Sequence, residues 1–256
     1  MKKMIGLISM VVLMYGCSNT SADDRELLVS SASSLTEAMG KMEEEFQKIE
    51  PDIELSFNYG SSSKLRSQIE QGAPADLFLS ASEKDMDLLR SQQLIESESV
   101  MPFAENRLVL ASLEKFAETA DFAEALMNTE ETIAVGEPDS VPLGDYTKQA
   151  LASQDLWEPL EGRLIYAKDA RQVVTYIESG NAELGIIYSS DAAISREIRG
   201  TLEMPGQTDP VVYPGAVVEA SQKQPEAEAF LDFVTGPKGQ AILEEYGFLA
   251  PSGENP

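Results

Sequence analysis

The chain has 256 residues, a formal net charge of −25, one cysteine and no histidine. A protein this acidic repels nucleic acid and anionic lipid surfaces, so we expect neither as a partner. The absence of histidine excludes Ser-His-Asp and Cys-His catalysis and imidazole metal ligands, and a single cysteine allows no internal disulfide. Few classes of enzyme remain, and we expect a protein without catalytic activity.

The N-terminus has the pattern of a lipoprotein signal peptide. Two lysines precede an apolar run of 12 residues from Met4 to Tyr15, and Cys17 follows shortly after it. A helix needs roughly 20 residues to span a bilayer, so the run predicts an export signal and not a membrane domain. We expect residues 1–16 to be a cleaved signal peptide, Cys17 to be lipidated and residues 17–25 to be a tether. The mature lipoprotein would face the periplasm or the cell exterior.

Beyond the tether, apolar runs alternate with amphipathic helical stretches, the pattern of an α/β protein with mostly parallel sheets. Residues 53–59 alternate apolar with polar side chains and predict an edge strand, which gives the sheet order 2-1-3 for the first three strands. In the segment before residue 53, apolar residues at helical spacing predict a helix that ends at Pro51. The predicted buried strands are 27–29, 77–79, 132–135 and 184–188, and further predicted helices are 62–71, 83–92, 144–154, 170–179 and 225–233.

Two serine clusters, residues 31–35 and 59–65, each join the end of a predicted strand to the start of a predicted helix. They place hydroxyls and unpaired backbone N–H groups at two helix N-termini, which bind anions without a cationic side chain. Helix capping is the alternative, because serine is a common N-cap and Ser34-Leu35-Thr36-Glu37 has the capping-box pattern. Acids such as Glu43, Glu44 and Glu45 do not prevent anion binding if they lie on outer helix faces, where salt screens them.

The mature chain would have 240 residues, which suits two domains. We expect one lobe from residues 26–105 plus 216–256 and a second from 106–215. The apolar segments 106–110 and 213–218 are suited to strands that cross between the lobes. The serine clusters follow the carboxyl ends of strands, where open α/β sheets bind ligands, so they should face a cleft between the lobes.

Six segments stand out in chain order. They are Ala32-Ser33-Ser34-Leu35-Thr36, Gly60-Ser61-Ser62-Ser63, the segment from Gln68 to Phe78, Ala134-Val135-Gly136-Glu137-Pro138, Val141-Pro142-Leu143-Gly144 and Gly185-Ile186-Ile187-Tyr188. In order and spacing they are similar to motifs of the periplasmic molybdate-binding proteins of ABC importers, a branch of the periplasmic-binding-protein fold. The resemblance runs from about residue 26 to about residue 248. It implies a type II periplasmic-binding-protein-like architecture, with two hinged lobes that each hold a mostly parallel sheet flanked by helices.

The resemblance also implies the ligand site. Ser34 and Ser62 would bind an oxyanion through their hydroxyls, Leu143 and Ala170 through their backbone N–H groups, and Tyr188 through its hydroxyl. The family usually has small or β-branched residues where this chain has Leu143 and Ala170, and this change leaves both backbone donors intact. The ligand would be molybdate or tungstate, with no cofactor and no metal bound directly, and the partner would be the permease of an ABC importer. The protein would be a monomer.

Three further residues have simpler interpretations than ligand binding. We expect Asp169 to cap the helix that begins at Ala170, Arg171 to pair with an acid, and Asp76 to accept hydrogen bonds from backbone N–H groups in its turn. Tyr188, considered without the resemblance, is most simply a half-buried core residue.

A site made only of donors suits a fully deprotonated tetrahedral dianion, because the proton of hydrogen phosphate would find no acceptor. Sulfate or another small anion on the same fold is therefore an alternative ligand. A serine hydrolase-like lipoprotein that uses Ser34 or Ser62 is a further alternative. It is disfavoured because Lys64 follows Ser62 by two residues, where a Ser-x-x-Lys motif needs three, and because the chain has no Gly-x-Ser-x-Gly motif.

Overall fold

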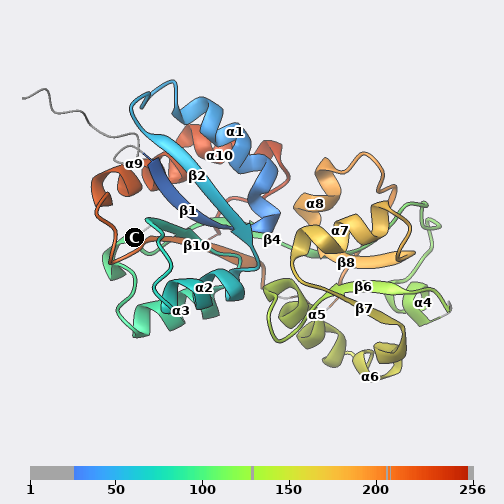
Figure 1. Ribbon diagram of the computed structural model, residues 1–256. Helices are drawn as coiled ribbons and strands as arrows, with labels where there is room; N and C mark the ends of the chain where they lie inside the picture. Colours follow the sequence, from blue (N-terminus) through green and yellow to red (C-terminus); the bar gives the residue numbers. More distant parts are fainter. Residues whose placement is uncertain (1–25, 128–129, 206, 208, 253–256) are drawn as a thin grey trace, which may run out of the picture.

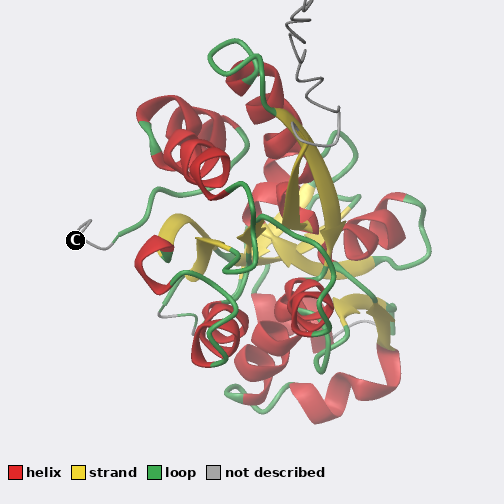
Figure 2. Cartoon of the chain, turned by 60° about the vertical axis from the view of Figure 1, so that its left-hand side comes forward, coloured by secondary structure: helices red, strands yellow, loops and turns green. Residues whose placement is uncertain are grey.

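The computed structural model describes residues 26–127, 130–205, 207 and 209–252. The chain forms two sheets of five strands, and helices flank both (Figure 1). We call each sheet with its helices a lobe. In the turned view of Figure 2 the strands run through the middle of the molecule and the helices lie outside them. The predicted signal peptide, Cys17 and the tether lie outside the described residues. No helix in the described part of the chain has the length and apolar character needed to cross a membrane.

The first sheet has the order β2-β1-β3-β10-β4, so the predicted order 2-1-3 is confirmed. β1 pairs in parallel with β2 and β3, whereas β10 is antiparallel to β3 and β4. In Figure 1, α1, α9 and α10 lie on one side of this sheet and α2 and α3 on the other. The strands are β1 (Glu26–Ala32), β2 (Glu54–Gly60), β3 (Leu77–Leu79), β4 (Met101–Asn106) and β10 (Val211–Val217). The helices are α1 (Thr36–Phe46), α2 (Ser62–Glu70), α3 (Glu83–Ser91), α9 (Gln224–Thr235) and α10 (Pro237–Glu245).

The second sheet has the order β7-β6-β8-β5-β9. β6 is parallel to β7 and β8, and β5 is antiparallel to β8 and β9. The strands are β5 (Leu108–Ser112), β6 (Ile133–Gly136), β7 (Leu164–Ala167), β8 (Leu184–Tyr188) and β9 (Gly200–Glu203). The helices are α4 (Phe122–Met127), α5 (Pro142–Ala152), α6 (Trp157–Leu160), α7 (Ala170–Glu178) and α8 (Ser189–Ile194).

One strand of each sheet runs against the other four, β10 in the first and β5 in the second. The prediction of mostly parallel sheets therefore holds for strand direction. Both reversed strands directly follow a connection between the lobes, because β4 precedes β5 and β9 precedes β10 in the chain. A strand that follows a helix of its own lobe begins at one edge of the sheet. A strand that enters from the other lobe begins at the opposite edge, and it therefore runs in the opposite direction.

The structure places the first lobe crossing within the predicted segment 106–110 and the second away from the predicted segment 213–218. The first crossing is at Arg107, between Asn106 at the end of β4 and Leu108 at the start of β5. The predicted crossing strand 213–218 falls instead largely within β10, which pairs with β3 and β4 of the first sheet. Residues 211–215, expected in the second lobe, thus lie in the first sheet. The second crossing lies between β9 and β10. An apolar run predicts a buried strand but does not say which sheet accepts its hydrogen bonds.

Apolar side chains fill the space between sheets and helices in both lobes. Met39 and Met42 of α1 are fully buried with Phe46, which places these methionines in the core as their helical spacing indicates. Phe46 packs edge-on against Phe230 of α9, with ring centroids 5.0 Å apart. This packing fixes the direction of α1, whose N-terminal end lies beside the serine-containing turn after β1.

Candidate functional site

A small hollow lies where helix starts of the two lobes face each other, with about 190 Å³ of empty space, part of which is open to solvent. We call it the cavity. All five residues of the predicted site, Ser34, Ser62, Leu143, Ala170 and Tyr188, line it. Among the described residues, no charged side chain contributes to its lining. The other lining residues are Ala32, Ser33, Gly60, Ser61, Ala81, Val141 and Pro142.

Ser34 reaches the cavity from a short 3-10 turn between β1 and α1. Its Oγ lies 3.0 Å from the hydroxyl of Tyr213 on β10. The predicted capping box does not form, because the 3-10 turn delays the helix start and makes Leu35 the N-cap, without a side-chain hydrogen bond. The hydroxyl of Thr36 instead donates to the Ser33 carbonyl at 2.7 Å. Ser34 is therefore available for a role other than capping.

Ser62 is the first residue of α2, and Ser61 before it is the N-cap. The Ser61 Oγ accepts a hydrogen bond from the Lys64 N–H at 3.3 Å, so this serine has the capping role expected for part of the cluster. The Ser62 Oγ accepts from the Ala81 N–H at 2.9 Å. Because that bond uses an oxygen lone pair, the hydroxyl hydrogen of Ser62 remains free to point into the cavity.

The second lobe presents two helix starts to the cavity. Leu143 lies in the first turn of α5 and Ala170 is the first residue of α7. Backbone N–H groups at these positions have no acceptor within their own helix and carry the positive end of the helix dipole. Asp169 caps α7 as predicted, since its Oδ1 accepts from the Gln172 N–H at 2.9 Å.

Two glycines allow α5 to start so close to the sheet. A Cβ atom on Gly144 would lie 2.2 Å from the carbonyl oxygen of Gly136 at the end of β6, a distance that no side chain tolerates. The backbones of α5 and β6 therefore touch directly at this point. This contact sets the position of the Leu143 N–H group at the cavity.

Tyr188 ends β8 and is fully buried, not half-buried as a simple core interpretation suggested. Its hydroxyl has no hydrogen-bond partner among the described residues although it lines the cavity. Burial raises the pKa of Tyr188 well above its ordinary value, and nearby Tyr213 adds to the rise. The hydroxyl thus keeps its proton at physiological pH and can donate a hydrogen bond to a ligand in the cavity.

Three polar contacts join the lobes around the cavity. Ser61 donates to the carbonyl of Ser140 at 2.6 Å, and Lys84 pairs with Asp145 at 3.1 Å. An ion pair between Arg171 and Glu37 is the third contact, and it confirms the prediction that Arg171 pairs with an acid. The contacts hold α1, α2 and α3 of the first lobe against α5 and α7 of the second.

Asp76 has the structural role expected of it, although with partners elsewhere in the fold. Its Oδ2 accepts from the Leu28 N–H of β1 at 2.8 Å, and its Oδ1 accepts from the Ser221 hydroxyl at 2.6 Å. The turn of Asp76 itself provides neither donor. The carboxylate therefore ties β1 to the segment that follows β10.

Negative charge lies outside the cavity lining. Glu44 of α1 is exposed, whereas Glu43 and Glu45 are half-buried, so the outer-face prediction is correct only in part. The lysines around Glu45 explain why it can lie there: hydrogen bonds, first from Lys48 and then from Lys238, lower its pKa to about 2. Its charge is balanced locally.

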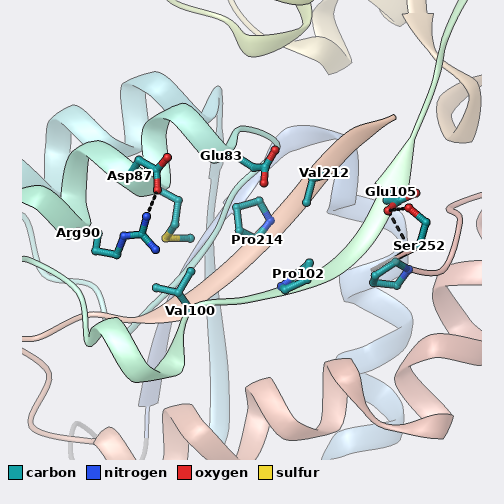
Figure 3. Close-up of a pocket in the computed structure, with 11 residues that line it drawn as sticks. Glu83, Asp87, Arg90, Val100, Pro102, Glu105, Val212, Pro214 and Ser252 are labelled. Atoms are coloured by element: carbon teal, nitrogen blue, oxygen red, sulfur yellow. Dashed lines mark hydrogen bonds and ion pairs between the residues drawn. The ribbon is translucent and has the colours of Figure 1, made fainter. Parts of the chain in front are cut away.

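A larger hollow, of about 460 Å³, lies on the first lobe between α3, β4 and β10 (Figure 3). Its charged lining residues are Glu83, Asp87, Glu105 and Arg90. Arg90 is already paired with Asp87 at 2.6 Å. Because the carboxylates outnumber the guanidinium group, this hollow does not suit an anion.

The sequence analysis missed two buried residues behind the cavity, Tyr213 and Asn106. Tyr213 contacts Ser34, and the Asn106 side-chain nitrogen lies 3.4 Å from the Tyr213 hydroxyl. Both side chains are fully buried. Nothing in the local sequence signals the pairing of Ser34 with a residue 179 positions away. Only the placement of β10 beside β3 and β4 brings them together.

Comparisons with known proteins agree with this architecture. Residues 27–249 match the family model described as bacterial extracellular solute-binding protein. The molybdate-binding protein ModA of Escherichia coli is 34% identical over 96% of this chain and 98% of its own length. A Bacillus subtilis protein named for a role as substrate-binding lipoprotein of an ABC transporter is 33% identical over 96% of both chains.

Among solved structures, the periplasmic molybdate-binding protein of Azotobacter vinelandii superposes with a TM-score of 0.80. It is 26% identical, and the match covers 88% of this chain and 100% of that one. Proteins of this kind bind solutes for ABC transporters and are not enzymes. From its fold, its near full-length relatives and the family match, this chain belongs to the bacterial extracellular solute-binding proteins.

Proposed function

We propose that this protein captures molybdate, and tungstate with it, in the cavity between its lobes and delivers the anion to the permease of an ABC importer. The observation that carries the proposal is that five residues with a neutral donor group line one small cavity, Ser34 and Ser62 on one side and Leu143, Ala170 and Tyr188 on the other. The similarity to molybdate-binding proteins supports the same ligand.

The chemistry of the donors matches a fully deprotonated tetrahedral dianion. Hydroxyl and backbone N–H groups can each donate to an oxyanion oxygen, and none of the molybdate oxygens carries a proton that needs an acceptor. Hydrogen bonds to a charged group contribute roughly 1.5–3 kcal/mol each, so five donors allow sub-micromolar binding after the costs of closure. Tungstate has nearly the same size and charge and would bind in the same way.

Capture would proceed by closure of the lobes around the anion. In this proposal the anion bridges hydroxyls of the first lobe and amides of the second, and the contacts Ser61–Ser140, Lys84–Asp145 and Arg171–Glu37 complete the closed form. The permease would recognise the closed monomer. A lipid on Cys17, with residues 17–25 as tether, would keep the protein at the membrane surface.

The test is a calorimetric titration of the purified protein with molybdate, tungstate, sulfate and phosphate, followed in parallel by the fluorescence of Trp157. Molybdate and tungstate should bind saturably with sub-micromolar dissociation constants, sulfate should bind much more weakly, and phosphate should not bind at the same concentrations. The absence of saturable molybdate or tungstate binding at micromolar ligand would refute the proposal. Tighter binding of sulfate would instead identify a sulfate-binding protein of the same fold.

A further inference from the structure

The cavity residue Ser34 is held by a chain of buried polar groups that the proposed ligand would not touch. Its Oγ lies 3.0 Å from the Tyr213 hydroxyl, and that hydroxyl lies 3.4 Å from the side-chain nitrogen of Asn106. Ser34 is almost fully buried, and Tyr213 and Asn106 are completely so. Buried polar groups have few alternative partners, so the direction of each hydrogen bond is fixed by its neighbours.

The orientation of the Asn106 amide follows from its other contacts. Its Oδ1 lies 2.9 Å from the backbone N–H of Arg107 and 2.9 Å from the Ser189 hydroxyl. A backbone N–H group can only donate, so the atom facing it must be the amide oxygen. The amide nitrogen therefore faces the Ser190 hydroxyl, at 2.8 Å, and Tyr213.

The amide orientation sets the direction of the remaining bonds. Because the Asn106 nitrogen donates to the Tyr213 oxygen, the Tyr213 hydrogen must point elsewhere. The Ser34 Oγ is an acceptor within hydrogen-bond distance of the Tyr213 hydroxyl, at 3.0 Å. Burial raises the pKa of Tyr213 above its ordinary value, which keeps that hydrogen in place. The Ser34 Oγ makes no other hydrogen bond with a described residue, so its own hydrogen is free to point to the cavity.

We propose that Tyr213 and Asn106 are positioning residues that fix Ser34 as a hydrogen-bond donor and thereby select anions without a proton. The proposal rests on the proposed function, because it concerns the selectivity of the same cavity. A serine hydroxyl free to rotate can also accept a hydrogen bond, and it would then accommodate the P–OH group of hydrogen phosphate. The hydrogen bond from Tyr213 occupies one lone pair of the Ser34 oxygen and so disfavours the orientation in which Ser34 accepts from the anion.

The closing experiment uses Tyr213→Phe, Ser34→Ala, the double variant and a matched control, Tyr166→Phe. Tyr213→Phe removes only the hydroxyl and keeps the ring contacts with Phe103, Tyr188 and Phe248. Tyr166 lies on β7 with 39% of its surface exposed and does not line the cavity. Molybdate affinity is measured by calorimetry, hydrogen phosphate affinity by displacement of molybdate at pH 8, and folding by thermal unfolding without ligand.

We expect Tyr213→Phe to weaken molybdate binding about tenfold and to lower the dissociation constant of hydrogen phosphate, calculated from the displacement after correction for the weaker molybdate binding. In the Ser34→Ala background the same change should have less than a twofold effect, because its target is gone. Tyr166→Phe should match the wild type. Equal losses in both backgrounds, equal weakening of both anions, or unchanged molybdate binding by Tyr213→Phe would each overturn the inference. Failure of the wild type to bind molybdate would instead refute the proposed function.

Discussion

The two sides of the cavity are built in different ways. The first lobe offers side-chain hydroxyls, Ser34 and Ser62, and each is held by a hydrogen bond from behind, from Tyr213 and from the Ala81 N–H. The second lobe offers the first-turn amides of α5 and α7, whose positions depend on where the helices begin. A hydroxyl donor is lost by changing its own residue, whereas an amide donor is lost only by moving the backbone. The predictions below test this difference, ordered by their expected effect on molybdate affinity.

The largest effect should come from Gly144→Ala. The new Cβ would lie 2.2 Å from the Gly136 carbonyl oxygen, so the start of α5 must move away from β6 and carry the Leu143 N–H with it. We expect molybdate affinity to fall about 100-fold or more and thermal stability to fall as well. Calorimetry and thermal unfolding measure the two effects.

Gly40→Ala is the matched control for that variant. Gly40 lies inside α1, and a Cβ there would meet nothing within 4 Å. Alanine should stabilise the helix by roughly 0.5–1 kcal/mol and leave affinity unchanged. Wild-type affinity in Gly144→Ala would show that the position of α5 does not matter for binding.

A second pair of variants separates side-chain donors from backbone donors. Ser62→Ala removes a hydroxyl and also leaves the Ala81 N–H without its acceptor, so affinity should fall roughly 10- to 100-fold with a modest loss of stability. Leu143→Ala removes a buried side chain but keeps the N–H group. It should cost roughly 2–4 kcal/mol of folding stability and change the affinity of the folded protein less than about threefold.

Both variants are compared by calorimetry at a temperature where each is folded, with unfolding measured separately. A greater loss of affinity in Leu143→Ala than in Ser62→Ala would contradict the view that the second lobe binds through its backbone and the first through its side chains.

Tyr188 is the side-chain donor of the second lobe and gives an effect of intermediate size. Because its buried hydroxyl lacks a partner among the described residues, Tyr188→Phe should leave the ligand-free protein as stable as the wild type or more stable. The same variant should bind molybdate roughly tenfold more weakly, since one donor to the anion is gone. Thermal unfolding without molybdate measures the stability of the free variant, and the rise in melting temperature on adding molybdate measures its binding. A variant that is less stable without ligand and binds normally would assign Tyr188 to the core alone.

The smallest effect on binding concerns Asp191 of α8, three residues after Tyr188. It is fully buried, and burial raises its pKa to about 7, although nearby Arg171 opposes the rise. A carboxyl group that ionises at about pH 4 when unfolded and about pH 7 when folded stabilises the protein only while it stays protonated. Its contribution is therefore complete below about pH 4 and lost as the pH rises through 7.

Asp191→Asn removes this ionisation while keeping the size of the side chain. The gain in melting temperature of the variant over the wild type should be larger at pH 8 than at pH 5, with molybdate affinity at pH 5 unchanged. The control is Asp87→Asn, which makes the same change at an exposed position of α3. The neighbouring variant Ser190→Ala is unsuitable as a control, because it would remove the acceptor of a hydrogen bond from Asn106. A gain that is equal at both pH values would show that Asp191 does not ionise in this range.

Much of this protein could be predicted from local patterns. Apolar alternation predicted the edge strand β2, and short apolar runs predicted β1, β3, β6 and β8. Asp169 was correctly predicted as a helix cap because capping depends on residues a few positions apart. Local pattern indicated the two serine clusters, whereas the resemblance to molybdate-binding proteins implied the five site residues, and the structure brings all five to one cavity.

Two differences involve relations between distant segments. The run 213–218 predicted a crossing strand, yet β10 pairs within the first sheet. The capping box that was the alternative for Ser34 does not form, because a 3-10 turn and the Tyr213 hydroxyl give Ser34 another environment. In both cases several local arrangements satisfy the same pattern, and the packing of distant strands selects one.

The sequence by itself determined many of the elements and the hydroxyl donors of the serine clusters, because these depend on side-chain period and on residue type near helix starts. The tertiary structure alone decided which strand is reversed in each sheet, how closely Gly144 approaches Gly136, and which way the Ser34 hydroxyl can point. These features depend on hydrogen bonds and contacts between residues far apart in the chain, which no local pattern encodes.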